Sequence, residues 1–219
     1  MIKNILLFFL ITTTLLASKN NDFSEKDKYL FEEIGFNYNS NNKNPIKRKA
    51  SYFPSDNKRA IVLVHQSGET MHSWYFFSNI LQKHGMASIA LENTSVEDIL
   101  GAIQFLKSKG YLDISLMGAS LGGASVLRVM NSYPQTNVSK VILLAPAIGP
   151  SLINDVQKFI VLAKDDFYSD KAYETYKEAS SPKLLKEYTG RAHAQKLFKT
   201  EHRDDLISQL LIFLDLSKK

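Results

Sequence analysis

The feature that most constrains this chain is a series of short apolar runs alternating with segments of helical periodicity. Most of these runs are apolar throughout, which is typical of strands in a sheet covered on both faces. The predicted strands are residues 60–64, 87–91, 114–117, 141–145, 159–163 and 184–188. Helices are expected over residues 73–83, 121–131, 171–179 and 204–216. A further helix is expected after the capping-box spacing of Thr94 and Glu97, and Gly110 should end it. The alternation predicts one α/β domain with a mostly parallel twisted sheet and helices on both faces.

The N-terminus has the pattern of a secretory signal. Residues 1–4 carry one positive side chain, and residues 5–17 are apolar except for three threonines. As a helix, such a segment spans about 20 Å, less than the hydrocarbon core of about 30 Å. We therefore expect residues 1–17 to be a signal peptide cleaved after Ala17, with an uncleaved anchor or a buried helix as the alternative. The mature protein would keep no membrane span and would be periplasmic or secreted, from a bacterium.

Residues 18–46 form a polar segment crowded with asparagines. A short helix over 26–34 followed by a mobile loop is expected there. An edge strand over 47–53 would then open the domain, which we expect to comprise residues 47–219.

Composition excludes several classes of function. The 219 residues have a formal net charge of +5, but the lysines are scattered and form no long basic block. This favours a solvated basic surface over a nucleic-acid site. The chain has no cysteine, which excludes disulfides, a thiolate nucleophile and cysteine-based metal sites. The oligomeric state is left open.

A glycine-flanked serine carries the chemistry. Gly118, Ser120 and Gly122 lie in a G-x-S-x-G motif between the predicted strand 114–117 and the predicted helix 121–131. A serine on so sharp a strand-to-helix turn is exposed, with the helix N-terminus behind it. Glycines on either side are required where strand and helix nearly touch. We therefore expect Ser120 to be a nucleophile.

Such a serine needs a base, and the base needs an orienting carboxylate. His193 follows the predicted strand 184–188 and is the only histidine after the candidate acids in such a position. Asp165 and Asp166 follow the strand 159–163, and either could be the acid or a turn-former. The chain order Ser, Asp, His matches that of enzymes with a nucleophile elbow. We expect Ser120, Asp166 and His193 to be catalytic, with Asp166 favoured over Asp165.

An oxyanion hole would complete the site. The backbone N–H of Leu121, directly after the serine, is one expected donor. The second is expected from the loop after strand 60–64, from the N–H of Gln66 or of Ser67. Each donor is worth about 3 kcal/mol of transition-state stabilisation. His65 in the same loop is expected to shape the loop rather than to act as a second base.

From about residue 58 to the C-terminus, the chain resembles serine α/β-hydrolases of the lidless dienelactone-hydrolase or small-esterase kind. The resemblance rests on four stretches, residues 63–68 together with Trp74, 118–123, 163–166 and 190–193. It implies an α/β-hydrolase fold without a separate cap domain. In that family the acid commonly falls three residues after a small strand-end residue, which selects Asp166 counted from Ala163. Many relatives have His-Gly where this chain has His65-Gln66.

We therefore expect a carboxylesterase-like serine hydrolase that cleaves a small-molecule ester, or less readily a thioester or amide, through an acyl-enzyme. No metal or organic cofactor is needed. Trp74 and Phe167 are candidate substrate-binding residues, although aromatic residues at such spacings are more often core, and a small or medium acyl group is favoured. Alternatives are an acyltransferase using the same triad and a catalytically inactive binding protein on the hydrolase scaffold.

Overall fold

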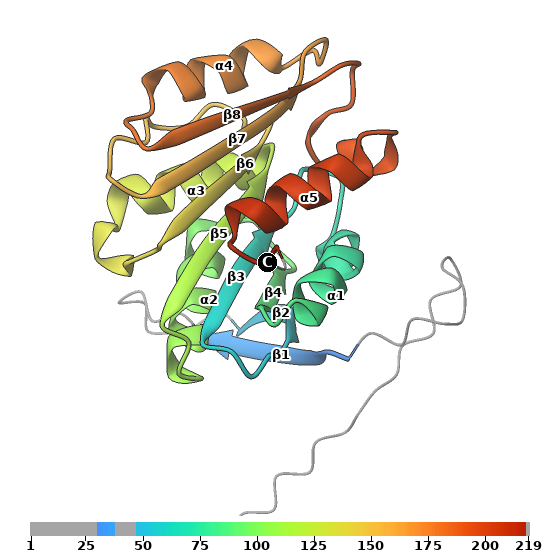
Figure 1. The fold of residues 1–219 in the computed structure, drawn as a ribbon. Helices are drawn as coiled ribbons and strands as arrows, with labels where there is room; N and C mark the ends of the chain where they lie inside the picture. Colours follow the sequence, from blue (N-terminus) through green and yellow to red (C-terminus); the bar gives the residue numbers. More distant parts are fainter. Residues whose placement is uncertain (1–29, 38–46, 218–219) are drawn as a thin grey trace, which may run out of the picture.

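The computed structural model describes residues 30–37 and 47–217, which form an eight-stranded sheet (Figure 1). The strand order is β1-β2-β4-β3-β5-β6-β7-β8, in which β3 to β8 are mutually parallel and β2 is antiparallel to both neighbours. The strands are β1 (Glu32–Asn37), β2 (Lys47–Phe53), β3 (Arg59–Val64), β4 (Ala87–Leu91), β5 (Asp113–Ala119), β6 (Lys140–Leu144), β7 (Gln157–Ala163) and β8 (Lys183–Tyr188). The predicted mostly parallel α/β architecture is confirmed.

Helices cover both faces of the sheet (Figure 1). The α-helices are α1 (Tyr75–Lys83), α2 (Val96–Ser108), α3 (Leu121–Ser132), α4 (Ser169–Glu178) and α5 (Arg203–Phe213), with short 3-10 helices η1 (Met71–Trp74), η2 (Pro134–Thr136) and η3 (Ala194–Lys199). One face packs against α2, α3 and α4, and the other against α1, α5 and η3. This agrees with the predicted helices to within a few residues at their ends.

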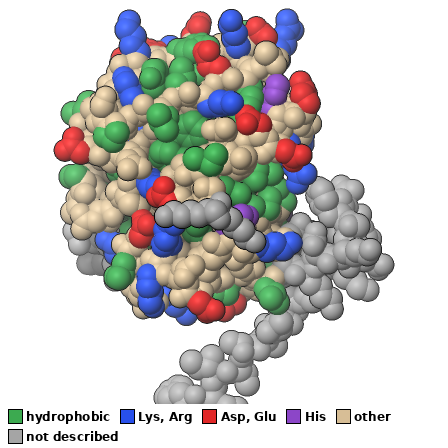
Figure 2. All heavy atoms as spheres, in the orientation of Figure 1, with side chains coloured by type: hydrophobic (Ala, Val, Ile, Leu, Met, Phe, Trp, Pro, Cys, Tyr) green, Lys and Arg blue, Asp and Glu red, His purple; other side chains and the backbone are tan. Residues whose placement is uncertain are grey.

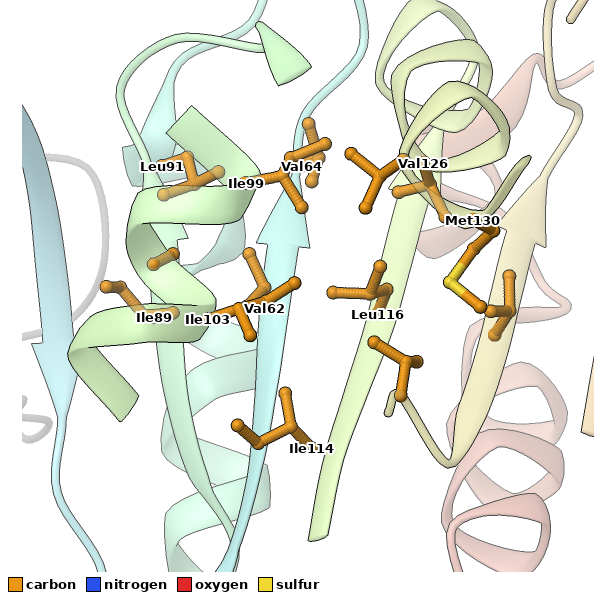
Figure 3. Packing of buried hydrophobic residues seen from close by; sticks show 14 of the residues in the cluster. Val62, Val64, Ile89, Leu91, Ile99, Ile103, Ile114, Leu116, Val126 and Met130 are labelled. Atoms are coloured by element: carbon orange, nitrogen blue, oxygen red, sulfur yellow. The ribbon is translucent and has the colours of Figure 1, made fainter. Parts of the chain in front are cut away.

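The core explains why the strands from β3 to β7 are almost continuously apolar, since alternate residues of each of these strands enter two different layers. Figure 3 shows Ile99 and Ile103 of α2 facing Val62 of β3 and Ile89 of β4. The next residue of β3, Leu63, belongs instead to the layer under α1 and α5. Burial on both faces removes the polar alternation that a one-sided sheet would show.

Local sequence sets the start of α2. The Ser95 hydroxyl caps the helix by accepting the Asp98 N–H at 3.2 Å, one residue later than the Thr94 and Glu97 capping spacing in the sequence indicates. Asp98 also accepts a hydrogen bond from Arg48 at 2.7 Å. A helix N-terminus favours a carboxylate in this position, so the cap and the ion pair stabilise the same end.

Two expectations for the N-terminal region are wrong. Residues 32–34, expected in a helix, lie in β1, whose six residues pair with β2 in antiparallel register. Consequently β2 is an inner strand rather than an edge strand, and the sheet begins before residue 47. The predicted signal peptide over 1–17, most of the polar segment over 18–46 and the expected loop lie outside the described residues.

The face of the molecule seen in Figure 1 carries both hydrophobic and charged side chains. Figure 2 shows hydrophobic side chains gathered over the middle of the face seen in Figure 1, with basic and acidic side chains interspersed around them. Among the residues that the structure describes, every helix is too short or too polar to cross a bilayer.

Candidate active site

The predicted site residues lie at one edge of the sheet. Since β3, β5, β7 and β8 are parallel, the loops that follow them leave the sheet on the same side. Ser120 follows β5, Asp166 lies three residues beyond the end of β7, and His193 lies in the loop after β8. Open α/β sheets place ligands at this carboxyl edge.

The serine sits on a strained turn between β5 and α3. Ser120 has φ 49° and ψ −115°, a conformation that residues other than glycine rarely adopt. A Cβ added to Gly118 would lie 2.6 Å from the Gly122 carbonyl oxygen, and one added to Gly122 would lie 2.5 Å from the His65 carbonyl oxygen. Both glycines are therefore needed for the close approach of strand, helix and the loop after β3.

Three side chains from separate loops form one hydrogen-bonded series. His193 Nε2 lies 2.8 Å from Ser120 Oγ, and His193 Nδ1 lies 2.6 Å from Asp166 Oδ2. The Asp166 side chain is almost fully buried, whereas that of His193 is one-fifth exposed. The Tyr168 backbone N–H donates to the other Asp166 oxygen at 3.2 Å. A carboxylate held on both oxygens orients the imidazole, which in turn reaches the serine hydroxyl.

Backbone hydrogen bonds join the acid loop to the histidine loop. The Lys164 N–H donates to the Tyr188 carbonyl at 2.8 Å, and the Asp165 N–H donates to the Gly190 carbonyl at 3.0 Å. The Asp165 side chain is exposed, and Asp166 is the one that contacts His193. Of the two aspartates that the sequence left open, the structure thus brings Asp166 to the histidine.

In the loop after β3, the backbone N–H of Gln66 is hydrogen-bonded within the protein, whereas that of Ser67 has no acceptor among the described residues. The Gln66 N–H donates to Gln195 Oε1 at 2.7 Å, so this group is occupied within the protein. In the described part of the chain, nothing accepts the Ser67 N–H or the Leu121 N–H. His65 spans the loop, with Nδ1 at 2.8 Å from the Gln66 carbonyl and Nε2 at 3.1 Å from the Glu92 carbonyl. This agrees with its expected role in shaping the loop.

Of the two predicted substrate-binding aromatics, Trp74 is wrongly assigned. It is 0% exposed and packs against Phe77 and Phe198 in the core under α1, because η1 turns its side chain inward. Phe167 is 89% exposed beside Asp166, and its ring packs edge-on against Tyr168. The ring of Tyr168 in turn lies 5.2 Å from the His193 imidazole.

Four hydrophobic side chains are exposed on segments that adjoin Ser120 or Asp166 in the fold, and we call them the apolar rim. Its members are Leu121, Ile148, Phe167 and Tyr168. The backbone anchors Ile148 near the serine, since the adjacent Ala147 N–H donates to the Ser120 carbonyl at 3.0 Å.

Gln195 is a residue of the site that sequence reasoning missed. It is buried, two residues after His193, and both its side chain and its backbone contact Gln66. Its position next to a candidate histidine is the only signal in the sequence, and a glutamine there is equally compatible with an exposed loop.

Burial and hydrogen bonds shift the pKa values of two side chains near the end of β8, Tyr188 and Asp205. Burial, together with a hydrogen bond from its hydroxyl to Asp205 at 2.9 Å, raises the pKa of Tyr188 well above its ordinary range. The hydrogen bonds that Asp205 accepts from Lys186 and Tyr188 lower its own pKa. No cluster of three or more histidine, aspartate or glutamate side chains within residues 30–37 and 47–217 could hold a metal ion.

Comparison with known sequences gives a partial match. A family model described as serine aminopeptidase, S33, matches residues 88–182, which contain Ser120 and Asp166 but end before His193. A search of curated proteins finds no match to the chain.

Comparison with solved structures covers more of the chain. An esterase from Pyrococcus furiosus superposes with a TM-score of 0.72 at 10% identity, covering 91% of this chain and 98% of that one. A dienelactone hydrolase from Anabaena variabilis gives 0.66 at 17% identity, with 82% and 94% covered. A monoacylglycerol lipase from Paleococcus ferrophilus gives 0.66 at 14% identity, with 78% and 100% covered. The resemblance stated from the sequence is confirmed at the level of the fold.

Proposed function

This chain has the α/β-hydrolase fold, and from that premise we propose that it is a serine hydrolase that cleaves a carboxylic ester. One observation carries the proposal: Ser120 Oγ, the His193 imidazole and the Asp166 carboxylate are hydrogen-bonded in series, at 2.8 and 2.6 Å. In this arrangement the imidazole can take the serine proton while the carboxylate stabilises the resulting charge.

In the first half-reaction, Ser120 Oγ attacks the ester carbonyl carbon while His193 Nε2 removes the hydroxyl proton. The carbonyl oxygen becomes an oxyanion, which we assign to the N–H groups of Leu121 and Ser67 because both lack a partner in the described part of the chain. Gln66 is not assigned this role, since its N–H is already donated to Gln195. Collapse of the intermediate breaks the C–O bond, and His193 gives its proton to the departing alcohol.

In the second half-reaction, water attacks the acyl group on Ser120. His193 Nε2 accepts a proton from the water and returns it to Ser120 Oγ as the acid leaves, which restores the free enzyme. The Asp166 carboxylate stays ionised throughout and holds the imidazole with Nδ1 protonated.

The apolar rim supports an ester with a small or medium apolar acyl group. Phe167 and Tyr168 expose aromatic surface next to Asp166 and His193, and Leu121 exposes its side chain next to the nucleophile. Such open surface favours a short chain lying across the rim, since a long lipid chain needs enclosure to bury its full length.

The test is the Ser120→Ala variant of the protein. Removing the nucleophile is expected to lower kcat for p-nitrophenyl esters by about a millionfold, as for the serine of other triads, with the melting temperature little changed. A fluorophosphonate should label the wild type at Ser120 and should not label the variant. Near wild-type turnover in Ser120→Ala, or an unlabelled wild type that is well folded, would overturn the proposal.

We also propose that the protein is exported, because residues 1–17 have the composition of a signal peptide. Mass spectrometry of the protein from its native cells should find a mature N-terminus at Ser18. An intact N-terminus at Met1 in the cytoplasmic fraction would refute export without affecting the proposed chemistry.

A further inference from the structure

Two buried glutamines, Gln66 in the loop after β3 and Gln195 in η3, form two hydrogen bonds with each other. The Gln66 N–H donates to Gln195 Oε1 at 2.7 Å, and the Gln195 N–H donates to Gln66 Oε1 at 2.9 Å. Each side chain thus accepts the backbone N–H of the other residue, and both residues are about 5% exposed. We call this reciprocal pair of hydrogen bonds the glutamine clasp.

A further hydrogen bond, from the Gln195 side chain to Ser73, holds the clasp in place. Gln195 Nε2 donates to Ser73 Oγ at 2.8 Å, and Ser73 Oγ donates to the Thr70 carbonyl at 2.6 Å. The Gln195 side-chain amide therefore uses both its acceptor and a donor on the segment that runs from the loop after β3 into α1. We call that loop, residues 65–70, the oxyanion loop, after the role proposed for Ser67. A buried amide with these partners has one preferred orientation, because rotation by 180° would oppose like groups.

The clasp adjoins two parts of the proposed catalytic machinery. Gln66 immediately precedes Ser67, whose N–H is unpaired in the described part of the chain, and Gln195 lies two residues after His193. The backbone of the same loop touches the elbow, since the Val64 and His65 carbonyl oxygens lie where a Gly122 side chain would project. A shift of the clasp would therefore move an oxyanion donor and the base together.

We infer that Gln66 and Gln195 are positioning residues that keep the Gln66 N–H out of the oxyanion hole, hold the Ser67 N–H in it, and fix that loop to His193. The inference rests on the proposed serine hydrolase function. It gives a physical reason for glutamine at position 66, where many members of the resembled family have glycine. A glycine could not accept the Gln195 N–H, and the clasp would lose one of its two hydrogen bonds.

The decisive variant is Gln195→Met, which keeps the length and apolar volume of the side chain but removes its hydrogen bonds. We expect kcat to fall about 10- to 100-fold with KM changed less than about threefold, because the loss falls on transition-state geometry. Gln66→Met removes the other hydrogen bond of the clasp, and we expect a loss of similar size. It serves as the independent variant if Gln195→Met does not fold.

The matched control is Gln82→Met, which also removes a glutamine that links two segments. Gln82 Nε2 donates to the Pro54 carbonyl at 2.8 Å and to the Leu30 carbonyl at 3.1 Å, near the end of α1 that lies away from the site. We expect it to lower the melting temperature and to leave kcat within about twofold of wild type. If Gln82→Met lowers kcat as much as the clasp variants do, the effect is one of stability, and the positioning role is refuted.

Amide hydrogen exchange tests the clasp without any substrate. In the wild type the Gln66 N–H should exchange at least about tenfold more slowly than the Ser67 N–H, and Gln195→Met should abolish the difference. Equal exchange in the wild type would overturn the clasp. A protected Gln66 with unchanged kcat in both clasp variants would overturn its positioning role. A wild type that Ser120-directed fluorophosphonate does not label would instead overturn the proposed function, and exchange would still decide whether the clasp exists.

Discussion

Gly122→Ala tests whether the reaction rate depends on the close approach of the strand-to-helix turn around Ser120 to the oxyanion loop. The added Cβ would lie 2.5 Å from the His65 carbonyl oxygen, 2.6 Å from the Val64 carbonyl oxygen and 2.9 Å from the Val64 carbonyl carbon. These are backbone atoms, so the clash cannot be relieved by a side-chain rotation. Restoring an ordinary contact of about 3.4 Å requires the loop and the elbow to separate by about 0.9 Å.

A separation of that size acts on the two N–H groups that we propose as oxyanion donors. Ser67 follows the displaced backbone, and Leu121 directly precedes the substituted residue, so the two N–H groups would no longer converge on one oxygen. A misplacement of about 1 Å costs about 100-fold, which corresponds to about 2.7 kcal/mol. We expect kcat/KM for a p-nitrophenyl ester to fall by this factor, mostly through kcat.

Gly85→Ala is the control for stability, because Gly85 has φ +77° and an added Cβ would meet the side chain of Asn57. It should lower the melting temperature without changing kcat/KM per folded molecule. The reasoning is refuted if a folded Gly122→Ala protein keeps wild-type kcat/KM. It is also refuted if Gly85→Ala loses activity to the same extent.

Two further predictions concern single side chains. Asp166→Asn should lower kcat by about ten-thousandfold, because the amide favours the wrong tautomer of His193. The matched variant Asp165→Asn should keep kcat within about twofold of wild type. Esterase assays of both variants check this, and the reverse ranking would refute Asp166 as the acid. Burial and the hydrogen bond to Asp205 raise the pKa of Tyr188 in the folded protein above the value of 10.0 that applies to the unfolded chain. As the pH rises, the unfolded chain therefore loses the Tyr188 proton first. The contribution of Tyr188 to the free energy of unfolding is fully present below about pH 10 and should fall as the pH rises further. Melting curves from about pH 9 to pH 12 should show a shallower fall for Tyr188→Phe, and an unchanged slope would contradict the linkage.

Much of the fold is predictable from the sequence because the strands from β3 to β7 are nearly apolar throughout. The run from Ala60 to Val64 is strand-length and buried on both faces, and such a pattern leaves few alternatives. The prediction for the N-terminal region is wrong because half of the residues of β1 are polar, and its pairing with β2 depends on contacts that local sequence does not encode. Trp74 was misassigned for a related reason, since sequence spacing does not reveal which side of η1 faces the core.

By itself, the sequence determined the alternation of strands and helices, the elbow around Ser120 and the loops that carry Asp166 and His193. These follow from local steric limits and from the shared direction of parallel strands. Only the tertiary structure decided that Asp166 rather than Asp165 meets His193, and that the Gln66 N–H is taken by Gln195. Neighbouring residues differ in where they point, and that direction is set by loop conformation and by hydrogen bonds to residues distant in sequence, 27 positions away for Asp166 and 129 for Gln66.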